Sequence, residues 1–503
     1  MIRLESFKVL KKLIVKNIHI EPRKVKAVYC VEKFSGETTI TEFIYSYDRP
    51  YFNKKNPADV NLASMMLAQI ALNYGLFFES IELDGLFDKT DKQFLKYMME
   101  NTSREILINK LLVKNEFLKT EFLGLKPEKR ELYTQAKLSF LNTRFENSKL
   151  RPNNKESDYN KYAILSSGGK DSLLTYGLIK EIAQPYPVFV NEAGRHWFTA
   201  VNAHRYYKNE ETNTEKPWCN SDRIFNWMLK QLPFIKENYK NIRADIYPIR
   251  LWTVAVFLFA VLPVVRKKAI GNVLIGDEYD TTLRGNYKGI SHYNALYDQS
   301  KYFDNAMTRY YHRKGWKIYQ FSLLRSMSEL LIMKVLMKRY PELQKQQVSC
   351  HAAHEVNGRM YPCGNCEKCR RIIGMIKALD ENPEKCGYNE SQIINGLKAL
   401  EGKSVKQLGS DSSHLYYLLL NKNLIQRNEF TIKVSKEHPE IMKLRFDEER
   451  SNLQDMPQNI RKPLFDILNK YSEGAVIRKN NQWMDINLDE DFIFIEKYRL
   501  DEK

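Results

Sequence analysis

The sequence contains little of what marks a membrane or secreted protein. Its most apolar run, Leu251 to Val265, has 15 residues, whereas a helix that crosses a membrane needs about 20. The N-terminus, MIRLESFKVLKKLIVKNIHIEPRK, alternates apolar and basic residues and lacks the continuous apolar core of a signal peptide. We therefore expect no membrane partner, and we predict that the apolar run forms a buried helix leading into a strand at Asn272–Ile275.

Cysteine is also scarce. The chain has seven cysteines, and four of them lie between positions 350 and 369. A secreted protein more often carries an even number of cysteines distributed along the chain. The pattern favours a reducing, cytoplasmic compartment and a single metal site. The other cysteines are Cys30, Cys219 and Cys386.

Arginine-rich tails, Gly/Arg repeats and low-complexity segments are absent, although the formal net charge is +18. Lysine and arginine are instead spread along the whole chain, which makes a nucleic acid the less favoured partner. Such a charge also suits an anionic nucleotide or an acidic protein, or it reflects a lysine-rich proteome. With 503 residues, of which 43% are hydrophobic and 12% aromatic, the chain is globular and long enough for two to four domains.

Residues 1–155 are predicted to form a separate α+β domain. The segments KAVYCVEKF and TTITEFIYSY have strand composition and are joined by a Ser-Gly turn. Asn61 to Tyr74 is predicted to be helical. Arg151–Asn160, RPNNKESDYN, is typical of a polar linker.

Residues 156–385 change in pattern, because short apolar strands there alternate with helices. That alternation predicts an α/β domain: a parallel sheet with helices on both faces, which binds ligands beyond the carboxyl ends of its strands. Residues 386–503 form a third, partly helical region that ends in the strand-like segments GAVIRK and DFIFIEKY. The strands predicted for the parallel sheet are Tyr162–Leu165, Val188–Val190, Ala244–Ile249, Val273–Ile275 and Lys317–Phe321.

The segment KYAILSSGGKDSLLTYGLIKEI is a strand, a tight turn and a helix. Its two glycines let the backbone approach a phosphate closely, and the amides at the start of the helix point at the anion. Lys170 can add positive charge, whereas Asp171 would repel phosphate and is better suited to hold Mg²⁺. The alternative is a chance Gly-Gly turn. The predicted ATP-binding residues here are Ser166, Ser167, Gly168, Gly169, Lys170, Asp171 and Ser172.

This loop is not a Walker-type loop, whose Lys-Ser/Thr follows four variable residues. It resembles the SGGxDS signature of the PP-loop ATP pyrophosphatases. The resemblance implies that ATP is cleaved between its α and β phosphates and that a substrate oxygen takes the AMP. It also places the adenosine beside Val188–Gly194. Gly276, Asp277 and Glu278 follow another predicted strand, where they either contact Mg²⁺ or substrate or form an ordinary solvated turn.

The cysteines form two overlapping CxxC spacings in Cys363-Gly-Asn-Cys366-Glu-Lys-Cys369, and Cys350 precedes them. Four thiolates match a closed tetrahedral Zn²⁺ site, which is structural because no position is left for substrate. His351 and His354 could each replace one ligand. An iron-sulfur cluster or a redox disulfide are the alternatives.

The combination of SGGxDS with a late C…CxxCxxC resembles the 7-cyano-7-deazaguanine synthases, and YPCGNCEKCRRI is similar to their zinc segment. The match covers residues 161–380, so both flanking regions lie outside it. Members of that family adenylate a 7-deazaguanine carboxylate and aminate it with ammonia. In part, FSLLRSMSELLI followed by SCH and CGNCEKC also resembles the ATP-dependent epimerase of UDP-N-acetylmuramoyl dipeptides.

A carboxylate substrate is already ionised at neutral pH, so adenylation needs positioning and charge stabilisation more than a strong base. We predict Lys170, Asp171 and Arg325 as catalytic residues, with Arg325 as the clamp for carboxylate or phosphate because it follows the strand Lys317–Phe321. Arginine binds both anions in a bidentate manner. Other candidates are Arg284, Arg309, His196 and His204, each of which could equally be an ordinary polar residue.

The sequence therefore predicts an enzyme that uses ATP, Mg²⁺ and Zn²⁺ to adenylate a small carboxylate and then form an amide or nitrile with ammonia or another amine. No glutaminase domain is evident. The long flanks could serve a macromolecular acceptor, such as a protein terminus in an anti-phage system. A tRNA-modifying PP-loop enzyme and a non-catalytic nucleotide-binding scaffold remain alternatives, and a homodimer remains open.

Overall fold

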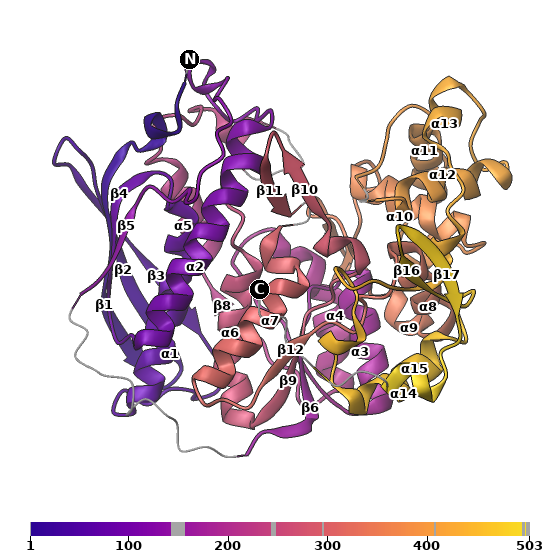
Figure 1. The fold of residues 1–503 in the computed structure, drawn as a ribbon, viewed down its shortest axis with the longest axis horizontal. Coiled ribbons are helices and arrows are strands. Elements are labelled where there is room, and N and C mark those ends of the chain that lie inside the picture. The colour runs from indigo at the N-terminus through magenta and orange to yellow at the C-terminus, as the bar shows by residue number, and fades with distance from the viewer. Residues whose placement is uncertain are drawn as a thin grey trace.

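A six-stranded mixed sheet forms the N-terminal part of the computed structural model (Figure 1), which describes residues 2–141, 156–242, 248–293, 296–406, 409–494 and 498. Three of its strands are parallel and the rest are antiparallel. Buried and less buried residues alternate along the strand Lys24–Glu32, as expected where one face of a sheet covers a core. Both strands predicted here are confirmed. The order is β5 (Lys137–Leu141), β4 (Phe78–Asp84), β1 (Leu10–Glu21), β2 (Lys24–Glu32), β3 (Thr38–Ser46) and β8 (Trp218–Cys219).

Helices α1 (Pro57–Ala68) and α2 (Lys89–Ile106) pack beside this sheet (Figure 1). The side chain of Asn56 accepts a hydrogen bond from Ala58 N and so caps the start of α1, where Pro57 takes the first helical position. A 3-10 turn, Gln69–Tyr74, continues the helix. The helix predicted over Asn61–Tyr74 therefore exists, with a tighter second half.

The second sheet has four parallel strands, with helices on both sides (Figure 1). Helices α6 (Val254–Lys268) and α7 (Lys301–Arg313) lie on one side, and α3 (Lys170–Ile182) and α4 (His196–Glu210) on the other. The predicted α/β class is thus confirmed at the level of a parallel sheet flanked by helices. The strand order is β12 (Tyr319–Phe321), β9 (Ile270–Leu274), β6 (Asp158–Leu165) and β7 (Gln184–Val188).

Three details differ from the predicted sheet. The second strand ends at Val188 rather than beginning there. Residues 158–160, predicted to belong to a linker, extend β6, since Asp158 N donates to Ala269 O at 2.8 Å. Most of the strand predicted at Ala244–Ile249 and half of the predicted linker, residues 151–155, lie outside the described residues.

The apolar run Leu251–Val265 forms most of helix α6, which is buried along most of its length, as predicted. Its C-terminus turns through Ala269, at φ 54°, directly into β9. Within the described residues, no helix combines the length and the hydropathy that a membrane crossing requires.

One apolar core joins the two sheets. The hydroxyls of Tyr45 and Tyr47 on β3 donate to Val256 O and Ala260 O of α6, at 3.1 and 2.8 Å. Strand β8, from the second region, also pairs with β3. The regions on either side of residue 155 therefore share a core, and the predicted domain boundary remains a prediction.

The C-terminal region packs in two places. Helices α11 to α13 pack with α8 and α10, whereas the three-stranded sheet β15–β16–β17 and α14 share the core of α3. GAVIRK forms β16 as predicted, but DFIFIEKY begins as a helix, because the Asp489 carboxylate accepts from Phe492 N and caps it. The elements are α8 (Glu329–Arg339), α10 (Glu367–Ala378), α11 (Glu390–Leu400), α12 (Asp411–Asn421), α13 (Glu429–Val434), α14 (Gln458–Leu468), α15 (Glu490–Phe494), β15 (Leu444–Phe446), β16 (Ala475–Lys479) and β17 (Gln482–Ile486). The remaining ones are α5 (Ser221–Leu229), α9 (Pro341–Gln344), β10 (Arg284–Tyr287), β11 (Ile290–Tyr293), β13 (His354–Val356) and β14 (Arg359–Tyr361).

Candidate active site and metal centre

The glycine loop connects the carboxyl end of β6 to α3. Gly168 has φ 76°, and a Cβ added there would lie 2.1 Å from the backbone oxygen of Thr199, so only glycine fits this approach. Gly169 stands at the N-cap of α3, and none of the described side chains caps it. The first amides of α3 are therefore available to an anion, aided by the helix dipole.

Serines and a threonine hold the loop in shape. Ser172 Oγ accepts from Ser167 N at 3.2 Å and donates to Gly169 O at 3.1 Å. Thr199 Oγ1, from the first turn of α4, donates to Ser167 O at 2.9 Å. Ser166 continues the strand pairing, since its N–H donates to Val188 O at 3.0 Å. The loop is thus fixed by its own side chains and by α4.

Three carboxylates surround the ammonium group of Lys170. Its Nζ lies 2.8 Å from Asp171 Oδ1, 3.7 Å from Glu278 Oε2 and 3.8 Å from Glu329 Oε2. Burial alone would lower the pKa of Lys170, but these carboxylates outweigh it and raise that pKa. For Glu278 the effect of burial has the opposite sign: burial raises its pKa, although Lys170 opposes the shift. A second cation, Arg371, pairs with Glu329 at 3.1 Å.

The segment after β9 meets the loop through Gly276. A Cβ added at Gly276 would lie 3.0 Å from the carbonyl carbon and the Cβ of Asp171, which is closer than most side-chain contacts. This approach brings Glu278 toward Lys170. Asp277 is turned elsewhere, because its N–H donates to Ser322 Oγ at 3.1 Å and its carboxylate faces Arg325.

Arg325 is buried, and its guanidinium is held by protein groups. Nη2 lies 2.7 Å from Asp304 Oδ2 and 3.3 Å from Asp277 Oδ2, and Nη1 donates to Gln299 O at 2.9 Å. Burial raises the pKa of Asp277 well above its ordinary value, against the effect of Arg325. These contacts describe a cross-link between segments, and the clamp role of Arg325 remains a prediction.

The other candidates have aromatic neighbours. The guanidinium of Arg284 lies 4.2 Å from the ring centroid of Tyr302, and the ring of His204 lies 5.4 Å from that of Phe189. Burial lowers the pKa of His204 to about 4, so it is neutral at physiological pH. Arg309 lies on α7. None of these contacts joins the three residues to the loop, and their site roles remain predictions.

The sequence analysis missed Glu329, which stands at the first position of α8. Ser328 caps this helix by accepting from Leu331 N at 2.9 Å, and Asp411 Oδ2 accepts from Glu329 N at 3.0 Å. Ser328 before this helix was a readable local signal for the helix start. Glu329 lies about 160 positions from Lys170 in the chain, which hid its place beside the loop.

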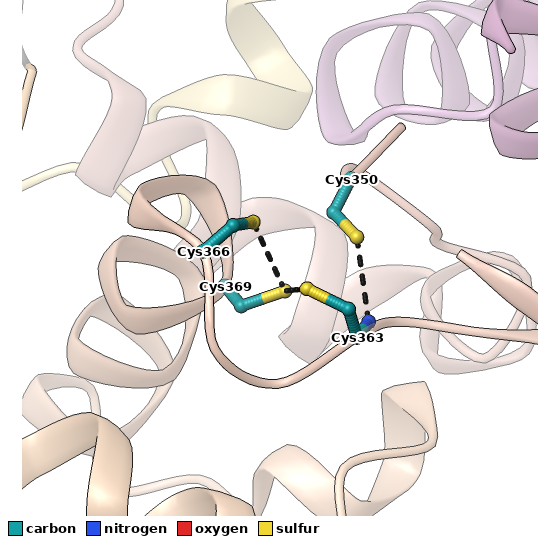
Figure 2. A group of neighbouring side chains, drawn as sticks. All are labelled: Cys350, Cys363, Cys366 and Cys369. Atoms are coloured by element: carbon teal, nitrogen blue, oxygen red, sulfur yellow. Dashed lines mark hydrogen bonds between the residues drawn. The ribbon is translucent and has the colours of Figure 1, made fainter. Parts of the chain in front are cut away.

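The four predicted cysteines form one cluster, with Cys366 and Cys369 at the start of α10 and Cys350 and Cys363 on the preceding segments (Figure 2). Their sulfurs lie within 4.8 Å of one another, with separations of 3.5 Å for Cys366–Cys369 and 3.7 Å for Cys363–Cys369. A tetrahedral site with Zn–S bonds of about 2.3 Å has edges of about 3.8 Å. The buried cluster can therefore hold a metal ion such as zinc, with four cysteines and no histidine.

The cysteine cluster adjoins the glycine loop. Val348 N donates to Gly168 O at 3.3 Å, two residues before Cys350. Asn202 of α4 exchanges two hydrogen bonds with the backbone of Met360, at 2.8 and 2.9 Å. The segment that carries the cysteines therefore contacts both the glycine loop and helix α4.

Two cavities, of about 510 and 490 Å³, lie at the opposite edge of the parallel sheet. The first opens at the beginnings of β9 and β12, near Ile270 and Ile318, and the second beside Tyr159 at the beginning of β6. Neither cavity is lined by residues of the glycine loop, so neither is a candidate nucleotide site.

No protein-family model matches the sequence, and no curated protein matches it. Functional inference therefore depends on the residues of the loop, the carboxylates around Lys170 and the cysteine cluster.

Proposed function

We propose that the protein is an adenylating enzyme of the PP-loop ATP pyrophosphatase kind. One observation carries the proposal: the uncapped N-terminus of α3 follows a glycine loop at the carboxyl end of a parallel strand, with carboxylates beside it. Amides at such a terminus bind phosphate, and ligands of parallel sheets bind at this edge.

The residues present suit ATP with Mg²⁺. The loop amides and the hydroxyls of Ser167 and Ser172 would hold the pyrophosphate end of ATP. Asp171 and Glu278 would hold Mg²⁺, which prefers carboxylate oxygens and phosphates as ligands. When bound, the metal neutralises charge on the leaving pyrophosphate. Lys170, which the three carboxylates keep protonated, supplies a fixed positive charge to the same place.

The proposed substrate is a small carboxylic acid, which attacks the α phosphate and becomes an acyl adenylate. The resemblance to the deazaguanine synthases makes a 7-deazaguanine carboxylate the first acid to test. Ammonia or another amine, including one on a protein or tRNA acceptor, would then replace AMP. Zinc in the cysteine cluster is assigned a structural role, because four thiolates leave no open position.

A tRNA thiolase is the weaker reading. Such an enzyme needs a reactive cysteine outside the zinc set, whereas Cys30, Cys219 and Cys386 are all buried. Burial raises the pKa of Cys219 and of Cys386 to about 12, which keeps both thiols protonated and unreactive.

Exchange of labelled pyrophosphate into ATP tests the proposal, because exchange requires reversible adenylation. With 7-carboxy-7-deazaguanine present, the protein should catalyse exchange, and Asp171→Asn should reduce it. If ATP is consumed without exchange for this acid and for a panel of other carboxylates, the proposal is wrong.

A further inference from the structure

Beside the loop lies a second group of polar residues, which includes Glu192 from the segment Val188–Gly194 that the sequence resemblance places beside the adenosine. It comprises Glu192 after β7, His196 at the start of α4, Asp222 on α5, Arg250 before α6 and His351 next to Cys350; we call these five residues the Glu192 cluster. Residues far apart in the sequence meet here. Such a convergence of charged and polar groups beside a candidate site is typical of ligand binding.

Glu192 is only 1% exposed, and one of its carboxylate oxygens has no partner. Oε1 accepts from His196 N at 2.9 Å, whereas no hydrogen-bond donor in the described part of the chain reaches Oε2. Leaving a buried charged oxygen unsatisfied is costly, which points to a ligand that supplies the missing donor.

Arg250, whose charge acts on Glu192, forms its ion pair with a different carboxylate. Arg250 Nη1 pairs with Asp222 Oδ1 at 2.7 Å, and its guanidinium lies 5.0 Å from the ring centroid of Phe225. A Cβ added at Gly194 would lie 2.9 Å from Glu192 Oε1 and 2.8 Å from Asp222 Cγ, so this glycine lets the two acidic residues pack closely. Among the described residues, these contacts leave Glu192 Oε2 without a hydrogen-bond donor.

Two contacts set the cluster next to the glycine loop, where the proposed function puts the phosphates of ATP. Thr199, one helical turn after His196, donates to Ser167 O at 2.9 Å, and its backbone oxygen packs on Gly168. The ring of His351, held by the cysteine segment, lies 4.3 Å from that of His196. Both histidines are partly exposed, and the backbone N–H of His196 donates to Glu192, so a small ligand at these residues would approach Glu192.

The amine step of the proposed function needs such a group. Ammonia and primary amines are protonated at neutral pH and cannot attack until they lose a proton, so this step requires a base, whereas adenylation does not. Burial raises the pKa of Glu192, against hydrogen bonds from its own backbone N–H and from His196 and against Arg250, while Asp222 adds to the rise. A carboxylate with a raised pKa accepts a proton more readily than an exposed carboxylate does.

We propose that Glu192 binds the amine nucleophile and is the base that deprotonates it; this inference rests on the proposed function. The ammonium group donates to Oε2 and passes one proton to the carboxylate. The freed nitrogen lone pair attacks the acyl carbon of the adenylate. A C–N bond forms, the bond from the acyl carbon to the phosphate oxygen breaks, AMP leaves with the electron pair, and the second proton leaves with AMP.

Amine binding can be tested without the acid. Methylammonium chloride should raise the Tm of the wild-type protein by about 1–2 °C more than tetramethylammonium chloride at equal concentration, because only methylammonium can donate an N–H. Glu192→Gln should abolish this difference. Glu215→Gln, at another buried carboxylate outside the cluster, should keep it. If methylammonium has no extra effect on wild type, or stabilises Glu192→Gln equally, Glu192 is not an amine site.

The catalytic part is tested with ATP, 7-carboxy-7-deazaguanine and ammonium chloride. Measured at saturating ATP, Glu192→Gln should reduce ammonium-dependent AMP release by about 10²-fold or more, and pyrophosphate exchange by far less. The residual rate should recover as pH rises, because more of the amine is then unprotonated. Equal loss of both steps, or loss of ATP affinity, would mean that Glu192 serves folding or the adenosine. Absence of exchange in the wild type would count against the acid substrate, while the methylammonium experiment would still decide the role of Glu192.

Discussion

The ammonium group of Lys170 lies 2.8 Å from the carboxylate of Asp171, its neighbour in the glycine loop. Both Asp171 oxygens face Lys170, at 2.8 and 3.0 Å, and Asp171 stands inside the first turn of α3 rather than at its cap. Asp171 therefore faces a cation and does not cap the helix.

Asp171→Ala should therefore abolish turnover while leaving the fold intact. Removing a metal ligand should reduce pyrophosphate release by at least about 10²-fold, whereas a lost helix cap would cost about 1 kcal/mol of stability. Pyrophosphate release and thermal melting should be measured on the same preparation, with Asp171→Asn as the isosteric control. Full activity with a lowered Tm would reverse the assignment.

Purified protein should contain about one zinc ion per chain, and Cys366→Ser should lose it together with stability, because structural zinc contributes folding energy. The matched control is Cys386→Ser, the same change at a buried cysteine outside the cluster, where Gln344 Nε2 donates to the sulfur at 3.1 Å. That variant should retain its zinc. Metal analysis and urea unfolding are the measurements. An iron-sulfur absorbance band, or unchanged stability in Cys366→Ser, contradicts a zinc centre.

Arg325→Met should destabilise the fold by about 3–5 kcal/mol, because it leaves the buried carboxylates of Asp277 and Asp304 without their cation. Arg284→Met removes an exposed guanidinium that lies over aromatic rings and should cost about 1 kcal/mol or less. Chemical denaturation of both variants checks the difference. Unchanged stability with lost activity in Arg325→Met would instead support the role of substrate clamp.

Asp298 should make stability depend on pH in a defined direction. Burial raises its pKa to about 7, although its side chain accepts from Val254 N at the start of α6. A raised carboxyl pKa means that the folded state binds the proton more tightly. The stability from this group is therefore complete below its ordinary pKa of 3.8 and is lost as pH rises through about 7.

Asp298→Asn, which resembles the protonated form at every pH, should gain stability relative to wild type between pH 5 and 7, by at most about 1.4 kcal/mol per pH unit. Urea unfolding at the two pH values measures this difference. A relative gain on acidification instead would contradict the raised pKa.

Local sequence was enough to predict the features whose partners are near in the chain. The glycine loop, the cysteine spacing and the buried helix α6 each depend on residues within one segment. So do β2 and β3, which are joined by a short turn. DFIFIEKY shows the limit even there, because the cap from Asp489 overrode its strand composition.

Contacts between distant segments could not be predicted. Neither the pairing of the two-residue strand β8 with β3 nor the approach of Glu329 to Lys170 leaves a periodic trace in the sequence. The sequence indicated that Arg325 follows the end of a strand, and β12 does end at Phe321. The direction of the Arg325 side chain depends on Asp304, on another helix, and no single-sequence pattern reveals that pairing.

The products of ATP cleavage test the central claim most directly. The purified protein should be incubated with Mg²⁺, ammonium chloride and ATP labelled at its α phosphate, with and without 7-carboxy-7-deazaguanine, and the nucleotides separated. Cleavage at the loop between the α and β phosphates predicts labelled AMP and an equal amount of pyrophosphate, formed only when the acid is present. Labelled ADP with orthophosphate as the primary products would contradict the account.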